Sequence, residues 1–213
     1  LKMSKKNILI ICAHPDDIEV GMGGTLLKYL EERYSITEVI FSKGEMSHPH
    51  LKPAVISKTR KKEANEIATS IGIKRLIYFN LPDTQLKEAI DETIKEKLKN
   101  IIIKVNPEKI FTVSEKDTHP DHRAVNKAVL EVANSLQKHY SIYTFQIWNI
   151  FTQNLPILQV DISKYFKEKI KIMKKHKSQW FSVYLQLLPV YLRAKLNGLK
   201  YNCKYAEIFY KIK

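Results

Sequence analysis

The chain has 213 residues, of which 44% are hydrophobic and 27% are charged, a composition typical of one globular domain. Its net charge of +14 comes mostly from lysines in amphipathic segments, and no base-reading motif accompanies it. We therefore expect solvated helix faces and no nucleic-acid partner. Two cysteines exclude a disulfide framework and a four-thiolate zinc site, and with no visible signal peptide or membrane span we expect a cytoplasmic protein.

Strand-like and helix-like segments alternate in chain order over the first two thirds of the sequence. Asn7–Cys12 is a continuous apolar run rich in isoleucine, which is typical of a strand buried on both faces. The other strands predicted in this part are Ile36–Ser42, Arg75–Tyr78 and Lys109–Val113. The predicted helices are Ile18–Arg33, Val55–Ile71 with Gly72 as its C-terminal cap, Leu86–Val105, and Pro120–Lys138.

The last third continues with strands and helices in a less regular order. Its predicted strands are Tyr143–Asn149, Leu158–Ile162 and Lys204–Tyr210, and its predicted helices are Lys164–His176 and Phe181–Leu196. Repeated strand–helix pairs imply right-handed βαβ units, a parallel sheet and helices on both of its faces. We therefore predict a Rossmann-like, three-layer α/β fold with a mostly parallel sheet, formed by a single domain over residues 1–213.

Polar side chains gather directly after four of the predicted strands. In open α/β sheets, ligands bind beside the carboxyl ends of the strands. The segments at those ends are His14-Pro15-Asp16-Asp17, Lys43-Gly44-Glu45, Leu81-Pro82-Asp83 and His119-Pro120-Asp121-His122. The sequence therefore predicts a functional site at this edge of the sheet.

The two histidine motifs carry the chemistry expected of a catalytic metal site. His14 and Asp17 are three residues apart, as are His119 and His122, so each turn can direct two side chains at one point. Two imidazoles and a carboxylate make a three-ligand zinc site with a position left for water, although other divalent ions fit such a set. Asp16 can then take the proton of that water. Either motif alone could be a capped helix start, but their joint placement at strand ends favours a site.

These motifs resemble the signature of the PIG-L/LmbE-like deacetylase family. The resemblance extends over almost the whole chain and rests on Ala13–Glu19 with Gly21, Gly23 and Gly24, on Ser42–Glu45, on Arg60 and Glu63, on Leu81–Asp83, on His119–His122, on His176–Gln179 and on Tyr205–Glu207. Members of this family are metal-dependent deacetylases of N-acetylglucosaminyl compounds, including precursors of bacillithiol and mycothiol, chitin disaccharide and glycolipid anchors. Their fold is Rossmann-like, which agrees with the strand–helix order.

The resemblance implies a role for each motif residue. It implies that the zinc ligands are His14, Asp17 and His122, and that Asp16 is the general base. It implies that protonated His119 holds the developing oxyanion or protonates the leaving amine. Further substrate-binding candidates are Arg60, Asp83, Glu45 and His176, although Glu45 could form only a turn and His176 could be structural. Asp121 could orient a neighbouring side chain or cap its own helix, and capping is the favoured role.

The expected function is that of a metal-dependent hydrolase. It removes the N-acetyl group from an N-acetylglucosaminyl-type substrate, a small N-acetylated amino sugar, through a zinc-bound water with Asp16 as general base. The alternatives are a zinc amidase acting on a larger acyl or thiol conjugate, an inactive metal- or sugar-binding module, and a nucleic-acid-associated protein. The short, charged approach Glu115–Thr118 differs from some relatives and leaves substrate selection open. Core or subunit packing fits the helical spacing of four aromatic residues, which makes a homo-oligomer plausible: Trp180, Phe181, Tyr184 and Tyr191.

Overall fold

The structure is a computed structural model that describes residues 6–48, 50–148 and 153–213. Seven strands form one sheet in the order β3-β2-β1-β4-β5-β7-β6. Their bounds are β1 Asn7–Cys12, β2 Ser35–Ser42, β3 Arg75–Leu81, β4 Lys109–Val113, β5 Ser141–Phe145, β6 Ile157–Asp161 and β7 Ala206–Lys211. The first five strands are mutually parallel and β7 runs antiparallel to both β5 and β6, so the predicted mostly parallel sheet is confirmed.

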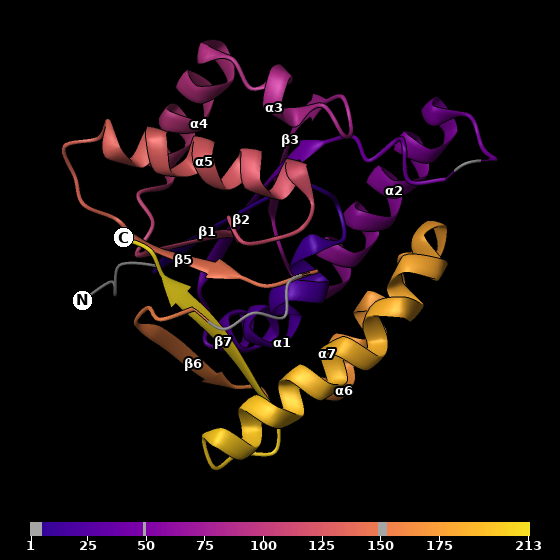
Figure 1. The fold of residues 1–213 in the computed structure, drawn as a ribbon, viewed down its shortest axis with the longest axis vertical. Helices are drawn as coiled ribbons and strands as arrows, with labels where there is room; N and C mark the ends of the chain where they lie inside the picture. The colour runs from indigo at the N-terminus through magenta and orange to yellow at the C-terminus, as the bar shows by residue number, and fades with distance from the viewer. Residues whose placement is uncertain (1–5, 49, 149–152) are drawn as a thin grey trace.

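Helices cover both faces of this sheet (Figure 1). Helices α3 and α4 both contact α5 on one side, and α6 and α7 both contact α1 on the other. The helix bounds are α1 Asp17–Glu31, α2 Pro53–Ile71, α3 Leu86–Ala89, α4 Glu92–Val105, α5 Pro120–Asn134, α6 Phe166–Met173 and α7 Trp180–Lys200, with a 3-10 turn at Lys177–Gln179 before α7. Gly72 caps α2 in the left-handed conformation, as predicted.

One predicted helix is wrong, because Leu86–Val105 divides into α3 and α4. The Asp91 side chain accepts a hydrogen bond from the Ile94 amide at 2.8 Å and so caps a new helix. The remaining bounds shift by a few residues at helix and strand ends, where hydrogen bonding is weakest. The predicted strand Tyr143–Asn149 ends earlier, at Phe145, and Asn149 lies outside the described residues.

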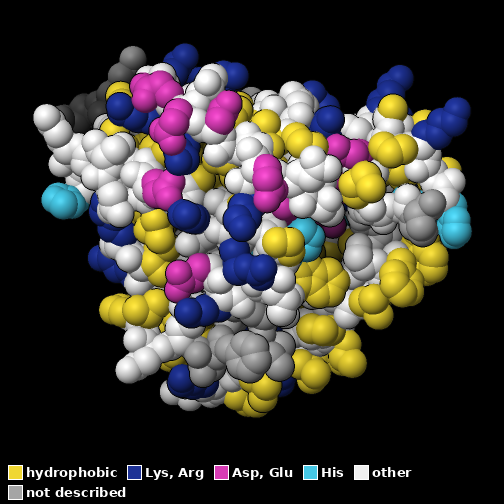
Figure 2. All heavy atoms as spheres, turned by 45° about the horizontal axis from the view of Figure 1, so that its top comes forward, with side chains coloured by type: hydrophobic (Ala, Val, Ile, Leu, Met, Phe, Trp, Pro, Cys, Tyr) yellow, Lys and Arg dark blue, Asp and Glu magenta, His cyan; other side chains and the backbone are white. Residues whose placement is uncertain are grey.

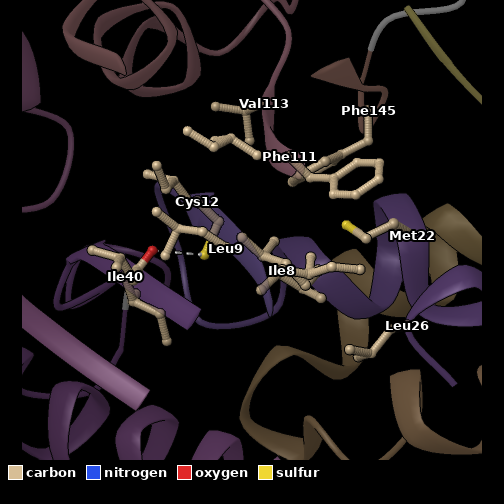
Figure 3. Packing of buried hydrophobic residues seen from close by; sticks show 14 of the residues in the cluster. Ile8, Leu9, Cys12, Met22, Leu26, Ile40, Phe111, Val113 and Phe145 are labelled. Carbon is tan, nitrogen blue, oxygen red and sulfur yellow. Dashed lines mark hydrogen bonds between the residues drawn. The ribbon is translucent and has the colours of Figure 1, made fainter. Parts of the chain in front are cut away.

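Strand β1 lies in the middle of the core, which explains its continuous apolar sequence. Every residue from Ile8 to Cys12 is fully buried, because β1 has a strand on each side and helices above and below. Figure 3 shows its side chains among those of neighbouring elements, including Ile40 of β2, Phe111 of β4, and Met22 and Leu26 of α1. This packing fixes the end of β1, from which the first histidine motif emerges.

Helix α1 approaches the rest of the molecule closely at its glycines. A Cβ added to Gly24 would lie 2.7 Å from the Ile162 side chain, closer than side-chain carbons normally come. The Gly24 and Thr25 amides donate to the buried Glu207 carboxylate at 3.1 and 2.7 Å. The small residues therefore allow the first turns of α1 to sit directly against β7 and the segment before α6, which holds the histidine motif in place.

Candidate active site

Three of the four strand-end segments, those after β1, β3 and β4, contribute side chains to one cavity of about 460 Å³. Six of the residues expected from the motifs line it: His14, Asp16, Asp17, Arg60, Asp83 and His119. Figure 2 shows a histidine side chain within a hollow on this face, with hydrophobic side chains around part of its edge. His122 is fully buried and lies directly behind these groups. The sheet edge predicted from the sequence is therefore where the polar groups meet.

Three side chains bring their donor atoms together at spacings that suit a tetrahedral metal ion. His14 Nδ1 lies 3.3 Å from His122 Nε2, and Asp17 Oδ1 lies 3.3 Å from the same His122 nitrogen. His14 Nδ1 and Asp17 Oδ2 are 3.7 Å apart. Zinc bonds of 2.0–2.1 Å at tetrahedral angles require ligand atoms about 3.3 Å apart. These three residues can therefore hold such an ion without rearrangement of the backbone.

Carboxylates behind both imidazoles determine which ring nitrogens face the centre. His14 Nε2 lies 3.0 Å from Asp83 Oδ1, and His122 Nδ1 lies 3.0 Å from Asp117 Oδ1. A ring proton is stabilised on the nitrogen that faces a carboxylate, which leaves a lone pair on the other nitrogen. The two free lone pairs then point at each other and at Asp17. Such an arrangement of acceptors suits a cation.

The pKa shifts in this cluster indicate a surplus of negative charge. Burial by itself would lower the pKa of His14, but Asp17, Asp121 and Asp83 raise it well above its usual value. Burial likewise opposes protonation of His122, yet Asp17 and Asp117 raise its pKa to about 9. In both cases the carboxylates outweigh desolvation, and the same field would stabilise a bound cation.

Among the described residues, two other groups of donors also come close enough to hold an ion, and both contain His14. One is His14, His119 and His122, and the other is His14, Asp83 and Asp121. The carboxylates of the second group already accept backbone hydrogen bonds: Asp83 from Met46 and Thr84, and Asp121 from Thr84 and Leu86. The same two carboxylates also face His14 Nε2. We therefore favour a role for Asp83 and Asp121 in orienting the His14 ring rather than in binding a metal.

Asp16 is a separate carboxylate at the cavity wall, fixed by a buried arginine. Arg60 Nη2 lies 2.5 Å from Asp16 Oδ1, and Arg60 Nη1 donates to the Gly44 carbonyl at 3.1 Å. Gly44 has a φ of +66°, and the Arg60 guanidinium fills the space that a Cβ would need. Arg60 therefore lines the cavity as expected, and it also orients Asp16, a role that the sequence did not suggest.

His119 is half-buried, and its ring lies beside that of His14. It caps α5 by accepting the Asp121 amide hydrogen at Nδ1, at 3.2 Å, so the ring proton resides on Nε2. Burial and the positive charges of His14 and His122 lower the pKa of His119. Both effects oppose the protonated form expected from the sequence, and the Nε2–H group can donate a hydrogen bond in either form.

Three other expectations are changed by the structure. Asp121 does not cap its own helix, because its carboxylate accepts from Thr84 and Leu86 and so joins α5 to the β3–α3 loop. Glu45 is outside the set of described cavity-lining residues, and its carboxylate accepts the Asp83 amide. His176 is buried away from the cavity, with Nε2 3.1 Å from Glu19 Oε2.

Sequence reasoning missed the partner of His122 and the rim of the cavity. Asp117 precedes the second histidine motif by two residues, so an acidic residue next to the motif could have indicated a partner for one of its rings. The rim includes exposed apolar side chains from three segments: Met46, Trp148, Trp180 and Phe181. Their common position depends on packing between distant segments, which no local sequence pattern indicates.

Comparison with known proteins agrees with this geometry. The sequence profile of the PIG-L family, described as GlcNAc-PI de-N-acetylase, matches residues 9–133. The chain belongs to the PIG-L family. It is 27% identical over 187 residues to a protein of Bacillus cereus named probable N-acetyl-alpha-D-glucosaminyl L-malate deacetylase 2, covering 82% of this chain and 84% of that protein. The family expected from the motif resemblance is therefore confirmed.

Solved structures confirm the fold of this PIG-L family member. The N,N'-diacetylchitobiose deacetylase from Pyrococcus horikoshii, complexed with an inhibitor, matches with a TM-score of 0.85 at 24% identity, over 98% of this chain and 84% of that one. The 4-carboxy-2-hydroxymuconate hydratase from Pseudomonas putida matches with a TM-score of 0.79 at 19% identity, over 98% and 96%. Because a hydratase shares the fold, the reaction has to be argued from the site.

Within the described part of the chain, no helix combines the length and apolar character needed to cross a membrane.

Proposed function

We propose that the chain, as a single domain over residues 1–213, is a zinc-dependent N-deacetylase of N-acetylglucosaminyl-type substrates. The observation that carries the proposal is the convergence of His14, Asp17 and His122 beside a separate carboxylate, Asp16, in a cavity large enough for a sugar ring. Membership of the PIG-L family supports it, since relatives of similar length are named as deacetylases of such sugars.

The proposed metal ligands are His14 Nδ1, His122 Nε2 and the Asp17 carboxylate. A Zn²⁺ ion held there would polarise a water molecule and the acetamide carbonyl group, lowering the barrier to attack. Another divalent ion could satisfy the same three atoms, although two imidazoles and one carboxylate are a common zinc set. Asp17 is well fixed for this role, because Oδ2 accepts the Ala13 and His14 amides at 3.0 and 2.8 Å.

Asp16 is the proposed general base. Its carboxylate accepts a proton from the attacking water while the hydroxyl oxygen bonds to the acetamide carbon. Arg60 holds Asp16 at the cavity wall and preserves its orientation, since the guanidinium is buried and is also hydrogen-bonded to Gly44. The carbon–nitrogen bond then breaks, the proton passes from Asp16 to the amine, and acetate and the free amino sugar leave.

His119 is the proposed donor to the developing oxyanion. Its Nδ1 is engaged by the Asp121 amide, so the Nε2 proton is available for this bond without a charged ring. A donor aimed at charge that develops during attack stabilises the transition state more than the ground state. Arg60 and Asp83 line the same cavity and remain the proposed contacts to the sugar.

The first experiment is a measurement of acetate release from N-acetylglucosamine, its malate and inositol conjugates, and diacetylchitobiose. Release that a zinc chelator abolishes, and that added zinc restores, would support the proposal and identify the substrate branch. The matched control is Asp17→Asn, which should lose both metal and activity. Release from longer acyl analogues but not from acetyl substrates would favour an amidase. Stoichiometric metal with no release from any substrate would favour a binding module.

The cytoplasmic location and the homo-oligomer expected from the sequence stay predictions, since the structure contains one chain.

A further inference from the structure

Helix α7 presents a long apolar face that the described chain does not cover. Nine of its hydrophobic residues each keep between 42% and 64% of their surface exposed. These residues, which we call the α7 apolar face, are Trp180, Phe181, Tyr184, Leu185, Leu188, Tyr191, Leu192, Leu196 and Leu199. Spacings of three, four and seven residues place them on one side of the helix, roughly opposite Val183, Val190 and Ala194, which pack inward.

This exposure contradicts one of the two packing roles that the sequence suggested for the aromatic residues. Trp180, Phe181 and Tyr184 are each more than half exposed, and Tyr191 keeps 42% of its surface exposed although its ring contacts Phe166 of the core. Contiguous apolar surfaces of this kind on a folded chain mark interaction sites. Figure 2 shows hydrophobic side chains gathered on the side of the molecule where α7 lies, up to the edge of the hollow.

The surface charges of the chain segment that carries this face are of one sign, whereas its Lys169 is buried against Glu207. Between Glu168 and Glu207 the sequence contains no Asp or Glu, but it contains nine Lys and Arg residues. Lys174 Nζ lies 5.8 Å from the centre of the Tyr184 ring, at the edge of the face. Lys195, four residues after Tyr191 and four before Leu199, lies on the same side of the helix. An apolar helix face flanked by cations and by Trp and Tyr is the pattern of a helix that lies in a lipid interface.

A second copy of the chain fits this face less well. Two copies joined through their α7 apolar faces would bring Lys174 and Lys195 of each toward the same positive segment of the other. No acidic residue of that segment could compensate the repulsion, and the net charge of +14 on each copy adds to it. An anionic lipid surface supplies the negative charge that the segment lacks, and acyl chains cover the apolar residues.

We propose that the α7 apolar face docks the protein on the surface of an anionic lipid bilayer, with the helix lying in the plane of the interface. The proposal does not depend on the deacetylase reaction. It does set the orientation of the cavity, because Trp180 and Phe181 belong both to the α7 apolar face and to the cavity rim. Docking therefore places the mouth of the cavity at the membrane surface.

Co-sedimentation of the full chain with vesicles tests this proposal. We expect binding to phosphatidylcholine vesicles that contain phosphatidylglycerol, little binding to phosphatidylcholine alone, and release by about 1 M salt, where screening acts over about 3 Å. Leu188→Gln should lower partitioning by about tenfold, because its exposed side chain would enter the acyl region. Ile103→Gln, at a residue of α4 that is 52% exposed, is the matched control and should bind like the unmodified chain.

The charge contribution has its own pair of variants. Lys195→Gln should weaken binding to the anionic vesicles, whereas Lys97→Gln on α4 should not. Unchanged melting temperatures would establish that all four variants are folded. Equal binding to both vesicle types, or no binding to either, would overturn the proposal. So would light scattering that shows a dimer which Leu188→Gln dissociates, because a second copy would then cover the face.

Discussion

Replacing Gly44 by alanine tests whether the position of Arg60 supports catalysis. Gly44 has a φ of +66°, and a Cβ placed there would lie 2.7 Å from Arg60 Cζ. Ordinary van der Waals contact begins at 3.4 Å, so the guanidinium would have to move by about 0.7 Å. Arg60 is buried and bonded to Asp16, so the movement would displace the proposed base as well.

The expected loss of activity follows from that displacement. A misplacement of about 1 Å in a catalytic group costs about 10²-fold in rate, so we expect kcat to fall by roughly ten- to hundredfold. The strained backbone should also lower the free energy of unfolding by roughly 1–2 kcal/mol. Bound metal should be unchanged, because Arg60 donates its hydrogen bonds to Asp16 and Gly44 and not to the three proposed ligands.

Gly72→Ala is the matched control for the backbone strain. Gly72 has a φ of +93°, but a Cβ there would meet nothing within 4 Å. Both variants should therefore lose stability through backbone strain, and Gly44→Ala should lose more because it also displaces the buried guanidinium, as thermal or urea unfolding would show. Acetate release at saturating substrate should fall only for Gly44→Ala. If Gly44→Ala kept the turnover of Gly72→Ala, or if it lost its metal, the proposed support of Asp16 by Arg60 would be refuted.

Three further changes test the site and the core. Asp16→Asn should keep stoichiometric metal, measured by elemental analysis, and lose about 10²–10⁴-fold in kcat; loss of metal would mean that Asp16 and Asp17 have exchanged roles. His119→Ala should also keep the metal and lose about 10²–10³-fold, and full activity would remove it from the mechanism. Burial, with Glu19 and Asp17 nearby, raises the pKa of Glu38, so stability of the unmodified chain should fall as pH rises above the usual glutamate value. Glu38→Gln should remove that fall and stabilise the fold by about 1–3 kcal/mol at neutral pH, but not at pH 4. If the variant and the unmodified chain had the same melting temperature at both pH values, this reasoning would be contradicted.

Much of the fold could be read from local sequence patterns. Within β1 the run Ile8–Cys12 is apolar throughout because a central strand of a parallel sheet is buried on both faces. Gly72 ends α2 because glycine adopts the left-handed conformation without cost. The break between α3 and α4 was missed, although Asp91 is a common capping residue, because the apolar spacing of Leu86–Val105 also fits one helix.

The proposed ligand set could be inferred from the sequence because parallel strands place their carboxyl ends at one edge. His14 and Asp17 follow β1, and His122 follows β4, which is the direct neighbour of β1 in the sheet. Adjacent strands and the three-residue spacing therefore bring these side chains together with little help from the rest of the fold.

The supporting groups depend on contacts between segments that are far apart in the sequence. Asp83 supports the His14 ring across 69 residues, and Arg60 reaches Asp16 across 44. Neither contact can be predicted from a local sequence pattern, because each depends on how a loop or helix packs against the sheet. The exposure of α7 is of the same kind. The sequence by itself determined which strands are followed by the polar motifs, which residue types could bind a metal, and that the last helix has an apolar face. Only the tertiary structure decided which carboxylate stands behind which ring and which side of α7 is left uncovered, since burial is a property of the packed chain.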